Sequence, residues 1–284
     1  MATFMNKSLS APSISKDTFI FDNADGYFVE ATVGDISQNT ITFGDGRDDL
    51  VSASGNISQN TITFGNGNFD SVSVGGSSSH DTITFGNGDD DAVTVFGNSS
   101  HDTITFNGTG AFMFVGFSGL GSTDHDTIIT NGNVGVNGSS SHDTIILGNG
   151  FDEFFAVSLS ADHDTITSGD ADLAHVEVQG SVYNTITLGN GNLDFVLLGT
   201  FIGGSSSHDT ITLGNGDNDL VQVGDPVAGS ISHDTITLGN GNGDAVTVSA
   251  GSGYDTIIVG NGNNDQITLN VLSGKAIGAD TIIT

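Results

Sequence analysis

A five-residue motif recurs along almost the whole chain, and its repetition constrains the fold more than any other feature. It reads Asp/Asn-Thr-Ile-Thr/Ile followed in most copies by an apolar residue, as in residues 60–64 and 81–85. Thirteen copies begin at residues 17, 39, 60, 81, 102, 126, 143, 164, 184, 209, 234, 255 and 280, most often 21 residues apart. A fixed period of this length is typical of solenoids, in which each repeat forms one coil.

A second apolar segment follows most pentapeptides, after a Gly-Asn-Gly turn. Both segments alternate between apolar and polar residues and are rich in β-branched residues, as in 61–64 and 71–74, so each predicts a short strand with one apolar face. Neither strand can bury that face alone, whereas stacked units make a continuous core. The sequence therefore predicts an all-β fold, a two-sheet parallel β-solenoid (a β-roll or β-helix) of about thirteen rungs. We expect one solenoid domain over 17–284, preceded by a polar segment over 1–16.

The composition is strongly acidic, with 34 Asp and Glu residues, four Lys and Arg residues and a formal net charge of −30. Such a chain repels phosphate backbones and anionic lipids, which argues against nucleic acid as a partner. Divalent cations are the natural counter-charge. There is no cysteine, which excludes disulfides and thiolate metal sites. No run of 18 apolar residues occurs, so no membrane span is expected.

Seven turns have the pattern Gly-Asn/Asp-Gly, two further residues and an aspartate. They begin at Gly44, Gly65, Gly86, Gly189, Gly214, Gly239 and Gly260. In a stack of coils the carboxylates lie about one rung apart and repel each other unless a cation lies between them. Calcium suits such a site, because it accepts many oxygen ligands in flexible geometry. The alternative is a turn closed by hydrogen bonds, with a ladder of asparagine side chains and no metal.

The turn pattern resembles the calcium-binding nonapeptide repeat of RTX proteins, G-G-x-G-x-D-x-U-x, which forms a parallel β-roll. The resemblance covers most of the chain from residue 17 onward. It implies calcium in the turns, type I secretion and folding outside the cell, and hence a secreted or cell-surface protein of bacterial type. With the turn carbonyls, the ligands that it implies are Asp49, Asp70, Asp91, Asp194, Asp219, Asp244 and Asp265. The repeat departs from the RTX pattern at the second glycine, by one extra residue before the aspartate, and by carrying the motif on one side only.

Histidine directly precedes seven of the pentapeptides. These residues are His80, His101, His125, His142, His163, His208 and His233. We expect them to form a column at the second turn of the coil. A transition-metal ladder and a pH switch are two hypotheses for this column. The third is a polar corner residue that bonds a neighbouring turn, favoured because Gln38 and Gln59 take the same position.

The outward residues of the pentapeptide are Thr-x-Thr in eight rungs and Thr-x-Ile in five. In-register stacking gives a flat lattice of hydroxyl and methyl groups, which resembles the T-x-T array of ice-binding β-solenoids. The candidate binding face consists of Thr40, Thr42, Thr61, Thr63, Thr82, Thr84, Thr103, Thr105, Thr185, Thr187, Thr210, Thr212, Thr235 and Thr237. The alternative is that threonine occurs there for its high β propensity.

The repeat is irregular in rungs six to eight, where aromatic residues concentrate. They are Phe112, Phe114, Phe117, Phe151, Phe154 and Phe155. We expect wider rungs with a bulkier core, an apolar binding patch being the alternative. An active site would have to lie in this region, where the non-repeat ionisable residues are Asp152, Glu153, Asp170, Asp172, His175 and Glu177. Arg47 and Lys275 are the rod's two cationic residues and lie far apart, so a lyase for acidic sugars is disfavoured and the protein is predicted not to be an enzyme.

Three functional hypotheses follow from these patterns. The leading one is a calcium-stabilised extracellular structural protein, such as a biofilm-matrix or surface subunit, that associates head to tail into filaments. The second is an ice-binding protein that uses the threonine lattice. The third is an adhesin or spacer segment of a larger type I-secreted exoprotein, for which a polysaccharide is the candidate partner.

Overall fold

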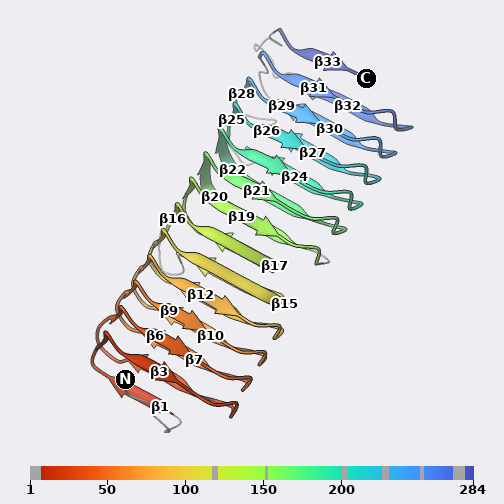
Figure 1. Ribbon diagram of the computed structural model, residues 1–284. Coiled ribbons are helices and arrows are strands. Elements are labelled where there is room, and N and C mark those ends of the chain that lie inside the picture. Colours follow the sequence, from red (N-terminus) through yellow and green to blue (C-terminus); the bar gives the residue numbers. More distant parts are fainter. Residues whose placement is uncertain are drawn as a thin grey trace. The chain divides into compact units, whose positions relative to one another are not determined.

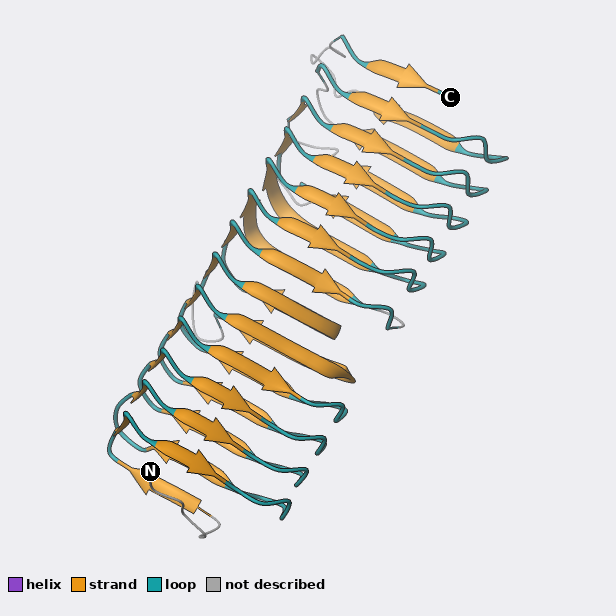
Figure 2. Cartoon of the chain, in the orientation of Figure 1, coloured by secondary structure: helices purple, strands orange, loops and turns teal. Residues whose placement is uncertain are grey.

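The computed structural model consists of strands joined by turns (Figure 2) and describes residues 8–116, 121–150, 153–199, 204–225, 230–249, 253–270 and 279–284. It divides into two compact units, Met1–Gly138 and Ser139–Thr284. In each unit the strands of successive coils pair in parallel, and the chain makes about twelve coils in all. The predicted all-β parallel solenoid is therefore confirmed.

One coil of unit 1 shows the plan that the others repeat (Figure 1). It runs through β10 (Ser71–Val74), β11 (Ser78–Ser79) and β12 (Thr82–Phe85) before a Gly-Asn-Gly turn leads to the next coil. The strands at the positions of β10 and β12 are the two that the sequence predicts, and we call their outer surfaces the second face and the threonine face. The two-residue strand β11 lies between the second strand and the next pentapeptide, where the sequence predicts only the second turn of the coil, so each regular coil has a short third strand.

Unit 1 contains the strands β1 to β17. Those of the second face are β1 (Ser8–Ala11), β4 (Phe28–Ala31), β7 (Leu50–Ala53), β10 and β13 (Ala92–Val95). The short strands are β2 (Ile14–Ser15), β5 (Ile36–Ser37), β8 (Ile57–Ser58), β11, β14 (Ser99–Ser100) and β16 (Thr123–Asp124). The threonine face contains β3 (Thr18–Ile20), β6 (Thr40–Thr42), β9 (Thr61–Thr63) and β12. Two longer strands, β15 (Thr103–Val115) and β17 (Thr127–Val136), pass from the threonine face into the second face. Strands β1 and β2 come from the polar N-terminal segment and pair with β4 and β5.

Unit 2 repeats the plan with the strands β18 to β33. The second face contains β20 (Phe154–Asp162), β22 (His175–Val182), β24 (Phe195–Leu198), β27 (Leu220–Val223), β30 (Ala245–Ser249) and β32 (Gln266–Asn270). The short strands are β18 (Ser140–Ser141), β25 (Ser206–Ser207) and β28 (Ile231–Ser232), and the ends of β20 and β22 fill the same place. The threonine face contains β19 (Thr144–Leu147), β21 (Thr165–Thr167), β23 (Thr185–Thr187), β26 (Thr210–Thr212), β29 (Thr235–Thr237), β31 (Thr256–Ile258) and β33 (Thr281–Ile283).

The core of each unit is built from identical side chains stacked on one another. Ile62, Ile83 and Ile104 occupy one register position in neighbouring coils of unit 1, and all three are fully buried. Next to them the rings of Phe43 and Phe64 stack with centroids 4.8 Å apart. The full stack in unit 1 is Phe21, Phe43, Phe64, Phe85 and Phe106. Unit 2 has buried leucine at the corresponding position in Leu147, Leu188, Leu213 and Leu238.

The irregular coils differ from the regular ones in their turns more than in their cores. In β15 the extended backbone runs through the place of the Gly-Asn-Gly turn, and Met113 fills the core position that Val93 has in the preceding coil. Phe155 is fully buried, whereas Phe112 is 43% exposed and stacks on Phe114 at 6.1 Å. The expected bulkier core is therefore present at Phe155 but not at Phe112, while Phe117 and Phe151 lie outside the described residues.

Candidate metal centre

The seven aspartates predicted as calcium ligands form one column in each unit, which we call the turn ladder. In unit 1 it consists of Asp49, Asp70 and Asp91, and in unit 2 of Asp194, Asp219, Asp244 and Asp265. All except Asp265 are at most 2% exposed. The aspartate ends the Gly-Asn-Gly turn, and in most coils the residue before it has a left-handed backbone, as at Phe69 with φ 65°.

One oxygen of each turn-ladder carboxylate joins two coils. In unit 1, Oδ1 of Asp70 accepts a 2.9 Å hydrogen bond from the main-chain N–H of Asp49, and Oδ1 of Asp91 accepts one from Asp70. In unit 2 the same bond runs from Asp194 to Asp219 and from Asp219 to Asp244, at 3.0 Å each. The aspartate side chain therefore takes the place that a main-chain carbonyl has in an ordinary sheet.

The second oxygen is buried without a hydrogen-bond partner in several of these residues. Among the described residues this holds for Oδ2 of Asp49, Asp70, Asp194 and Asp219. Burial of the carboxylate is the largest cause of a raised pKa, which reaches about 7 at Asp70 and at Asp194 and about 6 at Asp219. Neighbouring carboxylates of the same ladder raise the pKa of Asp70 further. A column of this kind is costly to ionise without counter-charge.

The donor set suits a hard divalent cation. Four of the turns present a buried carboxylate oxygen without a partner, and Oδ2 of Asp219 lies over its own turn, 3.1 Å from where a Cβ on Gly216 would be. Main-chain carbonyls of the glycine turn lie nearby in the preceding coil, such as that of Gly191 beside Gly216. Calcium accepts such a mixture of carboxylate and carbonyl oxygens. The orphaned Oδ2 atoms of Asp49, Asp70, Asp194 and Asp219 therefore fit the cation that the sequence predicts.

The alternative closure of the turn, an asparagine ladder, is also present. Nδ2 of Asn87 donates to Oδ1 of Asn66 at 3.0 Å, and Asn66 donates to Asp45 at 2.8 Å. In unit 2 the ladder continues through Asp170, Asn190, Asn215, Asn240 and Asn261. These amides lie on the exposed rim of the turn, whereas the turn-ladder carboxylates lie beneath it. The asparagine ladder and the turn ladder of carboxylates therefore occur together in the same turns.

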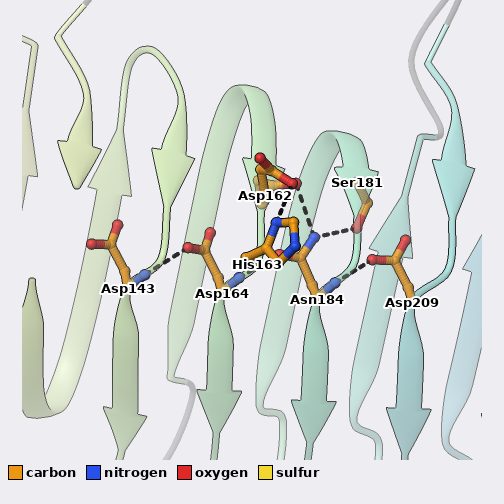
Figure 3. A network of polar contacts seen from close by, with 8 residues as sticks. Asp143, Asp162, His163, Asp164, Ser181, Asn184 and Asp209 are labelled. Carbon is orange, nitrogen blue, oxygen red and sulfur yellow. Dashed lines mark hydrogen bonds and ion pairs between the residues drawn. The ribbon is translucent and has the colours of Figure 1, made fainter. Parts of the chain in front are cut away.

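A second column, buried except at Asp17 and Asp280, is formed by the Asp or Asn that begins each pentapeptide, and we call it the strand ladder. In unit 1 it consists of Asp17, Asn39, Asn60, Asp81, Asp102 and Asp126. In unit 2 it consists of Asp143, Asp164, Asn184, Asp209, Asp234, Asp255 and Asp280. Figure 3 shows four successive members, Asp143, Asp164, Asn184 and Asp209, of which the last three each accept the main-chain N–H of the member before. The repeat aligns these residues with one another, but the sequence pattern does not reveal that most of them are buried.

In the strand ladder a serine bonds the second oxygen in some coils, whereas Oδ2 of Asp164 and of Asp255 is buried without a hydrogen-bond partner, as in the turn ladder. Ser78 donates to Oδ2 of Asp81 at 3.1 Å, and the single hydroxyl of Ser206 lies 2.7 Å from Oδ2 of Asp209 and 2.8 Å from Oδ2 of Asp234, to one of which it donates. Burial nevertheless raises the pKa of Asp81 to about 7 and that of Asp234 to about 8. A serine three residues before the aspartate is the sequence signal that could have located these carboxylates.

The predicted threonine lattice is in register within each unit. Thr61, Thr82 and Thr103 occupy one column and are exposed, and Thr63, Thr84 and Thr105 occupy the parallel column and are half-buried. Thr40 and Thr42 continue these columns in unit 1. In unit 2 the columns contain Thr185, Thr187, Thr210, Thr212, Thr235 and Thr237, together with Thr165 and Thr167 of the same type.

The residues considered for catalysis are not brought together into one site. Glu153 is buried at the turn-ladder position and accepts the main-chain N–H of Gly150 at 2.7 Å. His175 lies on the second face, with Nε2 3.9 Å from Oε2 of Glu177. Asp170 lies in the asparagine ladder, and Asp172 accepts from Asn192. Asp152 and Lys275 lie outside the described residues, and Arg47 lies over the ring of Phe69 at 5.3 Å.

Neither a protein-family model nor a curated protein sequence matches this chain. Among the residues that the structure describes, no helix is long and apolar enough to cross a lipid bilayer.

Proposed function

We propose that this chain is a structural β-solenoid whose turn aspartates bind calcium, and that it works outside the cell. The observation that carries this proposal is the set of buried, partnerless Oδ2 atoms of Asp49, Asp70, Asp194 and Asp219. A cation that binds the folded but not the unfolded chain adds about 2.7 kcal/mol of stability at a concentration 100 times its Kd. Calcium sites in extracellular modules bind the ion weakly and are filled at millimolar calcium, so we propose that the protein is secreted. Head-to-tail association and a polysaccharide partner remain predictions.

Thermal unfolding followed by circular dichroism tests the proposal. We expect the melting temperature to rise with CaCl2, to rise much less with MgCl2 and to fall on addition of EDTA at pH 8. Magnesium is the matched ion because it has the same charge but requires a smaller, octahedral site. An unchanged melting temperature in EDTA would remove calcium from the proposal.

A pair of variants separates the ladder from the general acidity of the chain. Replacing Asp70 and Asp91 by asparagine removes two buried carboxylates and is expected to weaken the response to calcium. Asp90 lies in the same turn but is exposed, so Asp90→Asn changes the charge without changing the ladder. An equal loss of calcium response in Asp90→Asn would show that the ion binds the surface charge rather than the ladder.

A second candidate function is ice binding, favoured by the registered columns that contain Thr61, Thr82 and Thr103. Threonines within one column lie about 4.8 Å apart along the stack, and the two columns lie about 6.6 Å apart along the strand. If this lattice orders water, the protein will shape ice crystals, and Thr82→Tyr will abolish most of the thermal hysteresis. Ser73→Tyr places the same bulk on the second face and should leave it unchanged. Absence of hysteresis and of crystal shaping at high concentration of the unaltered protein would exclude this function.

A further inference from the structure

A column of stacked rings lies at the corner of each unit between the short strand and the threonine face. In unit 1 it consists of His80, His101 and His125, with ring centroids 4.8 and 5.0 Å apart and planes within 7° of parallel. In unit 2 the neighbouring rings are 4.6 to 5.1 Å apart, in the order His142, His163, Tyr183, His208, His233 and Tyr254. The sequence predicts this column, and the structure places it beside the strand ladder.

The fold holds the main chain of these histidines and leaves their rings in solvent. Each has a left-handed backbone, with φ of 55° at His80 and 59° at His163. The main-chain N–H of His80 donates to the carbonyl of Ser100 in the next coil, while the imidazole itself is exposed. In two coils of unit 1 the position is taken by Gln38 and Gln59, which bond each other at 2.8 Å. The fold therefore accepts a non-aromatic residue there, so the coil does not require an imidazole at this corner.

A carboxylate fixes the ring orientation at one step of the column in each unit. In unit 2, Nδ1 of His163 lies 2.8 Å from Oδ1 of Asp162, and both side chains are about half exposed (Figure 3). In unit 1 the same contact joins His125 and Asp124 at 2.9 Å. A neutral imidazole that donates Nδ1–H to a carboxylate has its lone pair on Nε2. This is the arrangement by which carboxylates orient histidines that bind metals.

We propose that successive imidazoles of this column bind a divalent ion of the late first-row transition metals through Nε2, and that the step from His142 to His163 is the principal site of unit 2. Imidazole prefers copper, zinc and nickel, and copper(II) binds most tightly in this series. Metal–nitrogen bonds of about 2.0–2.1 Å place two ligating nitrogens at most about 4.2 Å apart. Because the ring centroids are 5.1 Å apart, the two rings tilt toward each other on binding, which their exposure permits.

The two tyrosines limit how far the metal column extends in unit 2. Tyr183 stands between His163 and His208, and Tyr254 follows His233. The phenol oxygen of tyrosine is a poorer ligand than imidazole for these ions. The unit therefore offers two separate imidazole pairs, His142 with His163 and His208 with His233. This inference does not depend on calcium, because hard oxygen ligands and imidazoles select different ions.

Titration of the full chain with copper(II) tests the proposal, with electron paramagnetic resonance to count nitrogen ligands and calorimetry to measure affinity. A large excess of CaCl2 is present throughout to occupy the carboxylates. We expect the nitrogen splitting of two imidazoles. The double variant His142→Gln/His163→Gln should lose one site, and Asp162→Asn should weaken that site about tenfold by removing the orienting carboxylate. Glutamine is the matched replacement because Gln38 and Gln59 occupy equivalent positions.

A variant that gains metal capacity distinguishes the loss of a metal site from a loss of folding. Tyr183→His makes the imidazole column continuous from His142 to His233 and should add metal capacity without changing the melting temperature of the metal-free protein. Unchanged stoichiometry in both the glutamine and the Tyr183→His variants, or a copper spectrum from oxygen ligands alone, would overturn the proposal.

Discussion

The main-chain N–H of Asp70 donates a 2.9 Å hydrogen bond to Oδ1 of Asp91, the residue at the same position one coil later. This bond joins the two coils, but it also holds a carboxylate in the interior, where burial raises the pKa of Asp91 to about 6. Each turn of this type therefore adds both a stabilising bond and a buried ionisable group. The stability of the solenoid is thereby tied to whatever neutralises its carboxylates.

Without divalent cations, the protein should be more stable in acid than in base. The pKa of Asp70 is raised to about 7 and that of Asp234 to about 8, from 3.8 in the unfolded chain. A raised carboxyl pKa contributes stability that is complete below about pH 4 and is lost as the pH rises through the folded value. We expect the melting temperature in EDTA to fall steadily between pH 5 and pH 8.5. A melting temperature that rises over this range would contradict the buried carboxyl groups.

Replacing Asp234 by asparagine should stabilise the cation-free protein at pH 8. Asn184 occupies the same ladder, and its Nδ2 donates to Ser181 at 2.8 Å and to the carbonyl of Ala161 at 2.9 Å. Ser206 of the preceding coil is placed to accept from the introduced amide, since it already lies 2.8 Å from Oδ2 of Asp234. Removing a poorly compensated buried charge should add about 1–3 kcal/mol to the free energy of unfolding, measured in urea. Destabilisation at pH 8 would mean that the carboxylate itself is required.

Gly67→Ala should be among the most damaging substitutions in unit 1. A Cβ at this residue would lie 1.5 Å from the main-chain oxygen of Gly46 in the preceding coil, so the two turns could no longer stack. We expect a loss of at least about 3 kcal/mol in the free energy of unfolding, in the upper range for single substitutions. Gly253→Ala is the matched control, because an added Cβ there meets no atom within 4 Å. Equal effects of the two variants would show that the turns do not stack this closely.

The phenylalanine stack of unit 1 should tolerate leucine but not alanine. Phe64 is 2% exposed and stacks on Phe43 and Phe85 with centroids 4.8 and 4.6 Å apart. Phe64→Ala leaves a cavity and should cost about 3–5 kcal/mol. Phe64→Leu introduces the residue that unit 2 has at this position, as in Leu213, and should cost less than about 2 kcal/mol. Denaturant unfolding measures both, and a leucine variant as unstable as the alanine variant would show that ring stacking is essential.

The sequence predicts most of the fold because the inward positions repeat with period two. Ile62 and Val72 could be placed in the core from alternation alone, and their neighbours could be aligned by the 21-residue period. The short strand could not be predicted in this way. Ser78 is polar, and its inward direction is explained by its bond to Asp81 in the folded chain. A two-residue strand is also too short to show any alternation.

The sequence predicts where the aspartates of the candidate site lie, but it does not predict the hydrogen bonds that they make. The turn pattern correctly aligns Asp70 with Asp91, yet charge repulsion alone suggests that the carboxylates face a shared ion rather than the backbone. The observed bond to the main-chain N–H depends on the left-handed residue before each aspartate, such as Phe69. That conformation is unusual for phenylalanine and is imposed by the stack, so a single repeat does not reveal it.

The ladder bonds keep the coils in register whatever the length of chain between them. Asp194 and Asp219 are 25 residues apart and Asp49 and Asp70 are 21 apart, yet both pairs make the same bond. In the coil between Asp194 and Asp219, the interval from Leu198 to Ser206 is longer than the corresponding interval from Val74 to Ser78 in unit 1. This corner thus behaves as a natural insertion point, at which a foreign peptide could be displayed once per coil at regular spacing while the stack beneath it stays intact.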